Sequence, residues 1–435
     1  MSPPVDNQRK KDTLKARLWS KIYSFGHNVK LWFTKDPGML SDQTQKALDA
    51  SLELELAQKF RGGIAKSAQF MGYASGNALT QQPYQDFSTV FYRLKALDQF
   101  DIDGFFQDEL GKNPSELFLE FDKVPVGAAS LSQVHRAKSK DGSLLAVKIQ
   151  YPGLEKTLVA DLDGPIDSLL GGISELLLDD ETVSSFKEGI LSELDYLKEA
   201  QSLVLFGRWF QSYHRWIFPK PIEHLSTKHI LTTSYVEGLP ILEFMKQQPP
   251  DLLRNAIGQD LLLFSLLSPL LHGHFNADPN PGNFLLSSQK NDFRLGFVDF
   301  GLTIKLHPTI LNADKLLFFA LFKSDPEMLR LAFNREELVQ DASVFQSSLY
   351  RRFEKLFSAP FLLTDFLYSA SYSEEVSSVF WELVKTRQFI LTAKNIFLWR
   401  QRIGMINLLG MLETRPNAPK ILGDLFALLK VGETR

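Results

Sequence analysis

The sequence contains no cysteine among its 435 residues. This absence excludes disulfides, thiolate metal sites and cysteine nucleophiles, and it is typical of proteins from reducing compartments. Long apolar runs are also missing, because the best candidate, LLLFSLLSPLL at 261–271, is shorter than the roughly 20 residues that span a bilayer and is interrupted by Ser and Pro. We predict a buried core helix there, and we expect a cytoplasmic protein without a transmembrane segment.

A large charge of one sign is missing too, since 48 Lys and Arg stand against 51 Asp and Glu. Nucleic acid is therefore not expected as a partner, because its phosphates require a concentrated basic surface. Residues 1–40 form a basic, aromatic segment that lacks the pattern of a secretory signal. This segment either lies on an anionic membrane surface, which would make the protein peripheral, or packs on the body with its lysines in water. The sequence does not indicate an oligomeric state.

The length exceeds what one core usually sustains and predicts two or three structural units. Apolar spacing indicates helices over 41–80 and within 101–122, a β-hairpin over 124–150 that turns at Asp141-Gly142, and further helices over 155–212. A second strand pair is predicted within 216–238, with its turn at 226–228. Beyond 240 the pattern is mostly helical. We expect an α+β protein with a helical extension (1–120), a sheet-containing unit (121–240) and a helical unit (241–435).

Three short motifs occur in the order that kinase-type phosphoryl transfer requires. Lys148 lies in the predicted strand LAVKIQ, Asp278 and Asn283 lie five residues apart in HGHFNADPNPGNFLL, and Asp299 begins the D-F-G of VDFGL. In such sites the lysine binds nucleotide phosphates, the first Asp orients the nucleophile, and the Asn and second Asp hold Mg²⁺. Taken alone, Lys148 also fits a solvated lysine at the end of a strand. The segment of Asp278 and Asn283 also fits an ordinary turn rich in Pro, Asn and Gly. Their shared order favours the catalytic interpretation.

With these motifs the sequence resembles the UbiB/ADCK family of atypical protein-kinase-like proteins, which includes kinase-like factors that support coenzyme Q biosynthesis. The similarity runs from about residue 55 to 305. VPVGAASLSQVHRA resembles the family's alanine-rich loop, SELDYLKEA its E-x-D helix, and AKSAQFMG its K-x-G-Q signature. The chain departs from this pattern at three positions. It has Ala68 where the family's signature has Gly, Gly127 where the family's loop has its first Ala, and Ser132 where the family has a Gly after the loop.

The resemblance implies a bilobal protein-kinase-like fold with ATP or ADP and Mg²⁺ as cofactors. It implies that Lys148 pairs with Glu199 on the regulatory helix, that Asp278 is the catalytic-loop Asp, and that Asn283 and Asp299 bind the metal. Asp195 and Glu199, four residues apart, are expected on one face of a single helix. The other residues that the resemblance assigns to the nucleotide are Gly127, Ala128, Ala129, Ser130, Tyr235 and Val236, and those assigned to the extension and the cleft are Lys66, Gln69, Glu193 and Asp195.

Several elements of conventional protein kinases are absent from the sequence. There is no G-x-G-x-x-G or A-P-E, and Asn276-Ala277 replaces the His-Arg before the catalytic Asp. We therefore expect an Mg-ATP-dependent ATPase or phosphotransferase without a peptide-docking segment. The family resemblance further implies a role in isoprenoid-quinone or other lipid metabolism, with an isoprenoid lipid as a further partner. The alternatives are a nucleotide-binding pseudokinase scaffold and a small-molecule phosphotransferase.

Overall fold

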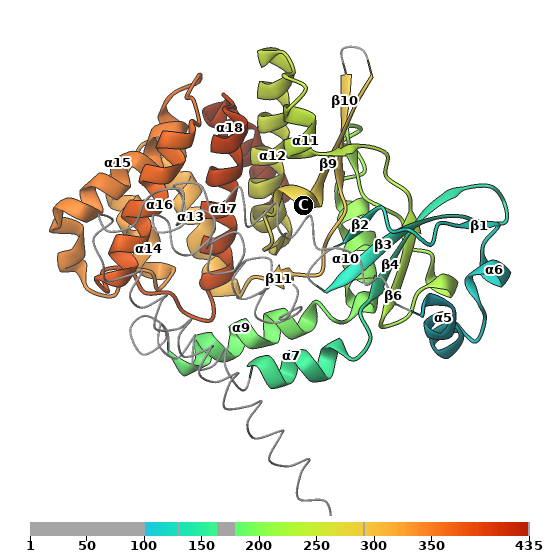
Figure 1. Ribbon diagram of the computed structural model, residues 1–435. Helices are drawn as coiled ribbons and strands as arrows, with labels where there is room; N and C mark the ends of the chain where they lie inside the picture. Colours follow the sequence, from blue (N-terminus) through green and yellow to red (C-terminus); the bar gives the residue numbers. More distant parts are fainter. Residues whose placement is uncertain (1–100, 129–130, 163–178, 290–291, 434–435) are drawn as a thin grey trace, which may run out of the picture.

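The computed structural model describes residues 101–128, 131–162, 179–289 and 292–433 (Figure 1). The helices are α5 Ile102–Leu110, α6 Pro114–Leu117, α7 Leu154–Leu162, α9 Asp180–Ser192, α10 Tyr196–Trp209, α11 Ile241–Met245, α12 Asp251–His272, α13 Pro308–Lys323, α14 Pro326–Arg335, α15 Ser348–Leu362, α16 Ala370–Lys385, α17 Ile396–Leu412 and α18 Ala418–Glu433. The strands are β1 Glu120–Phe121, β2 Gly127–Ala128, β3 Ser132–Lys138, β4 Leu144–Gln150, β5 Trp216–Ile217, β6 Ile230–Ser234, β7 Leu239–Pro240, β8 His274–Asn276, β9 Phe284–Gln289, β10 Asp292–Phe297 and β11 Thr303–Lys305.

A five-stranded antiparallel sheet forms the small lobe. Its strands lie in the order β1-β3-β4-β6, with β2 also paired to β3. The predicted hairpin is confirmed, since β3 and β4 pair from Ser132–Gln150 to Lys138–Leu144. Gly142 has a φ of 89° at the turn, a conformation that glycine adopts without strain, and the Asp141 carboxylate accepts a hydrogen bond from Ser143 N at 3.0 Å. Local sequence chemistry therefore fixes the position of Lys148 on β4.

One face of this sheet has its own apolar core. Val147 and Ile149 of β4 and Ile230 of β6 pack there with Phe106 of α5 and with Phe118. Alternate residues of β4 point to the opposite face, which is the face of Lys148. Residues of the predicted 1–120 extension thus pack in the core of the small lobe, while the three domain boundaries stay predictions.

The predicted strand pair within 216–238 forms only in part. Trp216–Ile217 (β5) pairs in parallel with β10, in a sheet of order β5-β10-β9-β7, whereas β6 pairs with β4. Pro219 and Pro221 lie between β5 and β6, and proline lacks the N–H that a continuous ladder needs. An antiparallel bridge between Pro221 and Thr233 still joins the segment to β6, about the predicted turn at 226–228. Backbone hydrogen bonds flank it, from the Ile222 N–H to the Thr232 carbonyl at 2.8 Å and from the Ser234 N–H to the Lys220 carbonyl at 2.9 Å.

The helical lobe is built around α12 and α17. The segment 261–271 lies in α12, and the prediction of a buried core helix there is confirmed. Aromatic side chains fill much of this lobe, for example Phe353, Phe380 and Trp399, whose rings lie 5.2 to 6.2 Å apart. Among the described residues, no helix combines the length and the apolar character that crossing a bilayer requires.

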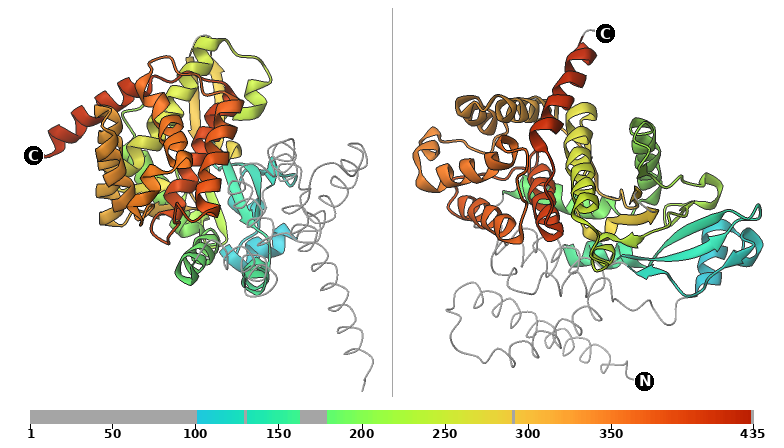
Figure 2. Two further views of the ribbon diagram at one scale, coloured as in Figure 1. Left: turned by 90° about the vertical axis from the view of Figure 1, so that its left-hand side faces the viewer. Right: turned by 90° about the horizontal axis from the view of Figure 1, so that it is seen from above.

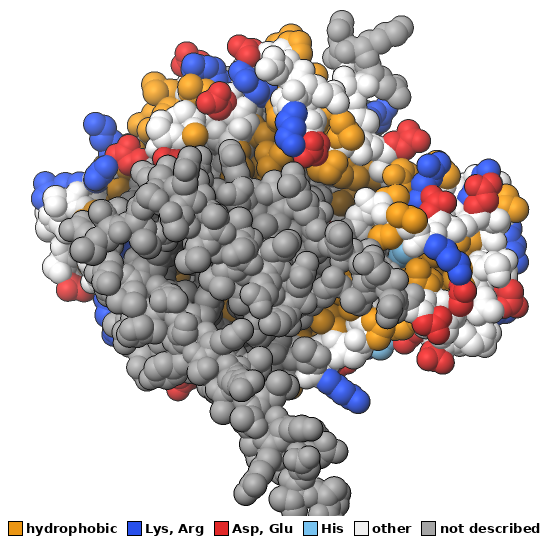
Figure 3. Space-filling model, in the orientation of Figure 1, with side chains coloured by type: hydrophobic (Ala, Val, Ile, Leu, Met, Phe, Trp, Pro, Cys, Tyr) orange, Lys and Arg blue, Asp and Glu red, His pale blue; other side chains and the backbone are white. Residues whose placement is uncertain are grey.

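The two lobes lie side by side, with the sheet of β1 to β4 and β6 on one side and α13 to α18 on the other (Figures 1 and 2). The short sheet of β8 and β11 lies between them (Figure 1). Figure 2 shows α18 running out from the body toward the C-terminus. On the face drawn in Figure 3, basic and acidic side chains are interspersed over the described surface. The expected bilobal kinase-like fold is confirmed.

Candidate functional site

Lys148 joins three parts of the chain. Its Nζ donates to Glu199 Oε1 and Oε2 at 3.0 and 2.9 Å, and to Asp299 Oδ2 at 3.3 Å. Glu199 lies on α10 and Asp299 follows β10, 51 and 151 residues from the lysine in sequence. The Glu199 side chain is 1% exposed, whereas that of Asp299 is 31% exposed. Glu199 is therefore an internal anchor, and Asp299 is the carboxylate that remains open to a ligand.

Two carboxyl groups surround one ammonium in this cluster, and these neighbours shift the pKa values of Lys148 and Glu199. Burial alone would lower the pKa of Lys148, but Asp299 and Glu199 outweigh it and raise that pKa well above its usual value. Burial raises the pKa of Glu199 to about 7, with a further contribution from Asp299 and an opposing one from Lys148. The lysine is thus firmly cationic, and Glu199 holds a proton more readily than an ordinary glutamate does.

Gly301 lies against the side chains of three acidic residues. A Cβ at this position would come within 3.3 Å of Asp299 Oδ1, 3.6 Å of Glu193 Cγ and 3.6 Å of Glu199 Oε2. The Gly301 N–H donates to Asp299 Oδ1 at 3.0 Å, and the Phe300 N–H donates to Glu199 Oε1 at 3.3 Å. The D-F-G backbone therefore orients both acids with its own amides, and glycine lets the chain pass close to them.

Asp278 is held in a network of short-range hydrogen bonds. Asn283 Nδ2 donates to the Asp278 carbonyl oxygen and to Oδ2, both at 3.1 Å. Asn276 Oδ1 accepts from the Asp278 N–H at 3.0 Å, while its Nδ2 donates to the Asp299 carbonyl at 2.6 Å. Pro281–Asn283 form a single 3-10 turn, capped by Asn280. The Pro and Gly residues of this segment thus make the tight turn that brings Asn283 back onto Asp278.

Arg400 is a site residue that the motifs did not indicate. It extends from α17 and donates through Nη2 to Asp278 Oδ1 at 2.8 Å, and the two side chains are only 4% and 8% exposed. No spacing rule connects residues 122 positions apart. A signal was present in the sequence, however, because Arg400 and Arg402 interrupt the otherwise apolar run IFLWRQRIGMINLLGML, and buried arginines require acidic partners.

The prediction that Asp195 and Glu199 share one continuous helix is wrong. α9 ends at Ser192 with Glu193 as its C-cap, and α10 begins at Tyr196 with Asp195 as its N-cap. The Asp195 carboxylate accepts from Leu197 N at 3.1 Å and Lys198 N at 3.4 Å. Aspartate favours this position because its side chain satisfies the unpaired amides of the first helical turn. Asp195 thus starts the helix that carries Glu199.

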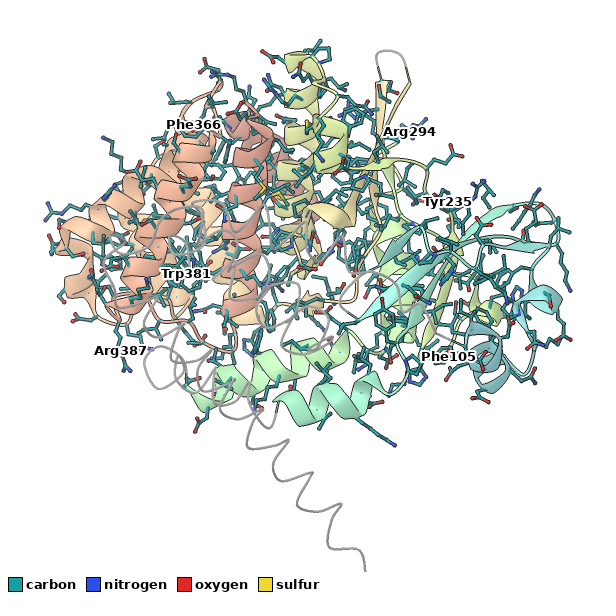
Figure 4. All side chains as sticks on the ribbon, in the orientation of Figure 1. Phe105, Tyr235, Arg294, Phe366, Trp381 and Arg387 are labelled. Carbon is teal, nitrogen blue, oxygen red and sulfur yellow. The ribbon has the colours of Figure 1, made fainter. Side chains whose placement is uncertain are left out.

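The remaining predicted residues lie on the small lobe or outside the described residues. Gly127 and Ala128 form β2, opposite Val134 and Gln133 of β3. Tyr235, labelled in Figure 4, lies on the small lobe. Its N–H donates to the Leu144 carbonyl at 3.0 Å, and its ring centroid lies 5.9 Å from the Arg136 guanidinium. Val236 is buried, and a Cβ on Gly296 would meet it at 2.5 Å. Lys66, Gln69, Ala129 and Ser130 lie outside the described residues.

The oxygen atoms of Asn283 and Asp299 fit a hard cation. Because Asn283 Nδ2 is engaged by Asp278, its amide oxygen remains as the metal-binding atom, and Asp299 contributes a partly exposed carboxylate. Within the described ranges, no three His, Cys, Asp or Glu side chains form a metal-binding cluster. Two protein oxygens completed by phosphate and water suit Mg²⁺. Asn283 and Asp299 stay the predicted ligands.

Comparison with known proteins agrees with this geometry. Atypical kinase COQ8, mitochondrial, from Saccharomyces cerevisiae is 28% identical over 268 residues, which are 61% of this chain and 53% of that protein. Protein ACTIVITY OF BC1 COMPLEX KINASE 8, chloroplastic, from Arabidopsis thaliana is 31% identical over 232 residues, 51% of this chain and 30% of that protein. The chain therefore spans about half or less of the length of these two curated relatives.

A solved structure extends the similarity of fold. The complex of Rv3197 with erythromycin, from Mycobacterium tuberculosis, has a TM-score of 0.61 at 23% identity, over 88% of this chain and 96% of that one. The profile of the ABC1 atypical kinase-like domain matches residues 89–331, which is more than half of the chain. This match confirms the resemblance found in the motifs, and the chain belongs to the ABC1 atypical kinase-like family, whose members include COQ8 and the AarF domain-containing kinases.

Proposed function

We propose that the chain binds ATP with Mg²⁺ and transfers the γ-phosphoryl group to water or to a small acceptor. The observation that carries this proposal is the contact of Lys148 with both Glu199 and Asp299, at 2.9 to 3.3 Å, across three elements. A lysine held between a helix Glu and a D-F-G Asp is the arrangement that phosphoryl transfer of the kinase type requires. A scaffold that only binds nucleotide would not need the further network around Asp278.

Each residue has a distinct role in this proposal. Lys148 binds the phosphates while Glu199 holds its ammonium in the cleft. Asp278 accepts a proton from, or orients, the attacking hydroxyl or water, with its carboxylate fixed by Asn283 and Arg400. Asn283 and Asp299 would hold Mg²⁺, which supplies charge neutralisation for the phosphates when it is bound.

The segment after Asp299 supports a small acceptor or water in place of a peptide. β11 follows within a few residues and pairs with β8, and α13 begins at Pro308. The chain thus passes from the D-F-G into a short strand and directly into a core helix. This connection leaves no extended segment on which a peptide substrate could dock.

The relatives' names extend the proposal to the biological setting. COQ8 of yeast is named as a mitochondrial atypical kinase, and the sequence motifs resemble factors that support coenzyme Q biosynthesis. We propose that this chain likewise acts in isoprenoid-quinone or other lipid metabolism. We further propose that residues 1–40 bring it to an anionic membrane surface, with each Lys or Arg near that surface contributing about 1 kcal/mol.

Thermal shift and phosphate release test the catalytic proposal. ATP should raise the melting temperature with Mg²⁺ and not with EDTA, and Asp299→Asn should abolish this rise, whereas Asp108→Asn on the exposed face of α5 should not. Asp278→Asn should retain nucleotide binding and lose phosphate release. Equal stabilisation with EDTA would contradict the metal assignment. Nucleotide binding without phosphate release by the unaltered chain would favour the pseudokinase scaffold.

Liposome experiments test the membrane proposal separately. Vesicles with anionic lipid should stimulate ATP hydrolysis by the full chain, and added salt should diminish the effect by screening. Deletion of residues 1–40 should abolish stimulation and leave nucleotide binding intact. Undiminished stimulation of the truncated protein would place the lipid site elsewhere in the molecule.

A further inference from the structure

Tyr196 lies against the ammonium of Lys148. It is the first residue of α10, and its side chain is 1% exposed. The Tyr196 N–H donates to the Lys228 carbonyl at 3.0 Å, which fixes the start of the helix. From this position the ring faces Lys148, whose Nζ lies 5.0 Å from the ring centroid. Glu199 follows three residues later and bonds the same ammonium, so α10 holds Lys148 by two separate contacts.

The hydroxyl of Tyr196 lies near the Ser132 side chain, whereas it is the ring that Lys148 Nζ faces. The hydroxyl is buried, and burial raises the pKa of Tyr196 above its usual value. The face of the ring therefore carries the interaction, because a cation over an aromatic face is attracted by the electron density of the ring, most strongly where water is excluded.

Lys148 has three anionic or aromatic neighbours, and one of them also has another proposed role. Asp299 contacts Lys148 at 3.3 Å, yet it is also the proposed metal ligand. A carboxylate that binds a divalent cation attracts the lysine less strongly, which leaves Glu199 and the Tyr196 ring to hold it. Tyr196 thus matters most when the phosphates and the metal are present.

We infer that Tyr196 is a positioning residue for the nucleotide phosphates, because its ring holds the Lys148 ammonium in the cleft together with Glu199. This inference rests on the proposed function, since it assumes that Lys148 binds phosphate. In this inference Tyr196 affects nucleotide binding only through its contact with Lys148. Loss of the ring should therefore weaken the binding of ADP, which carries phosphates, and leave the binding of adenosine unchanged.

Calorimetry on the full chain with Mg²⁺ tests the inference, using ADP and adenosine as probes. Tyr196→Phe keeps the ring, so its ADP affinity should remain within about twofold of the unaltered protein. Tyr196→Leu should lose about five- to thirtyfold in ADP affinity, the range expected for a cation over an aromatic face. In a Lys148→Met background, Tyr196→Leu should cause no further loss, because its effect passes through the lysine.

A second series avoids the risk that the leucine variant fails to fold. Phenylalanine and 3,4,5-trifluorophenylalanine, incorporated at position 196, have nearly the same shape but differ in the charge on the ring face. ADP affinity should fall about fivefold with the trifluorinated ring, and adenosine affinity should not change. The same pair at Tyr368, a buried tyrosine of the helical lobe, should leave both affinities unchanged.

The outcomes separate the inference from the proposed function. Equal losses of ADP and adenosine affinity, or no effect of fluorination, would overturn the role of Tyr196. If Lys148→Met itself left ADP affinity unchanged, the assignment of Lys148 to the phosphates would be wrong, and the inference would fail with it. A loss in Lys148→Met without any loss in Tyr196→Leu would leave the proposed function intact and refute only the positioning role.

Discussion

At the scale of single residues, Asp278 is fixed from two directions. Asn283 bonds one carboxylate oxygen from within the same loop, and Arg400 bonds the other from α17. Both Asp278 and Arg400 are almost completely buried. A buried ion pair contributes little net stability, but removal of one partner leaves a charge in a medium that solvates it poorly. The Arg400 contact therefore fixes the position of the proposed base and pairs its buried carboxylate with a cation.

Substitution of Arg400 should show this dependence on charge. We expect Arg400→Leu to lower the free energy of unfolding by about 3 kcal/mol, because it removes a cation from beside a buried carboxylate. In an Asp278→Asn background the same substitution should cost much less, since the surplus charge is then gone. Urea denaturation of the two single variants and the double variant measures the difference. Equal costs in both backgrounds would show that packing, and not charge, explains the effect.

His135 gives a second prediction at this scale. The imidazole is fully buried, stacks on Phe121 at 5.1 Å between ring centroids, and donates from Nδ1 to the Asp122 carbonyl at 2.8 Å. Burial lowers the pKa of His135 below its ordinary value of 6.5, although the neighbouring Asp122 opposes this shift. The unfolded chain therefore binds a proton more readily than the folded one as the pH falls below 6.5.

The sign of the pH effect follows from this shift. The stability that neutral His135 contributes is fully present above pH 6.5 and is lost as the pH falls toward the lowered pKa of the folded state. We expect the free energy of unfolding to fall more steeply between pH 7 and 5 in the unaltered protein than in His135→Gln. Denaturant curves at several pH values measure both slopes, and parallel curves would contradict the assignment.

How much of the site could be predicted from the sequence depends on how local its chemistry is. Lys148, Asp278, Asn283 and Asp299 stand in short motifs, and the structure brings Lys148 to Asp299 and Asn283 to Asp278. Arg400 and Tyr196 act across the fold, so only three-dimensional packing shows that they contact Asp278 and Lys148. Turns can be predicted from the local sequence, whereas contacts between distant helices cannot.

At the scale of elements, the break between α9 and α10 shows how a motif can mislead. SELDYLKEA has continuous helical spacing, yet Asp195 leaves the helix and caps the next one. Aspartate competes for backbone amides, which favours helix starts over helix interiors. The strand pair within 216–238 stays short for a related reason, because the prolines before β6 lack the N–H groups that a longer ladder needs. The alternating pattern alone also does not reveal that β5 pairs with β10 and β6 with β4.

The capping role of Asp195 can be tested against its predicted role in the cleft. Asp195→Ala should lower the free energy of unfolding by about 1 kcal/mol, because α10 loses its N-cap, while Asp195→Asn should cost only a few tenths. Chemical denaturation measures both values. If Asp195 also acts on the nucleotide through its charge, Asp195→Asn should lose phosphate release while it retains stability. Equal destabilisation by Asn and Ala would contradict the capping role.

At the scale of the whole molecule, the two lobes differ in how they are stabilised. The large core includes α10, α12 and α17, and its aromatic contacts link Phe206 of α10 to Phe300 of the D-F-G at 4.6 Å between ring centroids. The outer face of the small sheet has a separate and much smaller core around Phe106. Regions with few buried apolar contacts open at lower free energy than the main core. The sheet that carries Lys148 is therefore the part of the fold that should open first.

Hydrogen exchange with Phe106→Ala tests this difference between the lobes. Phe106 is fully buried and contacts Phe118 and Phe121 edge to face, with centroids 6.1 and 5.7 Å apart. Truncation of such a ring costs about 3 to 5 kcal/mol, and we expect this loss to appear as faster amide exchange in β3 and β4. The amides of α12 and α17 should exchange as in the unaltered protein, because they belong to the other core. Equal acceleration of exchange in both lobes would show that the molecule unfolds as one cooperative unit. The sheet that carries Lys148 would then open at the same free energy as the helical lobe.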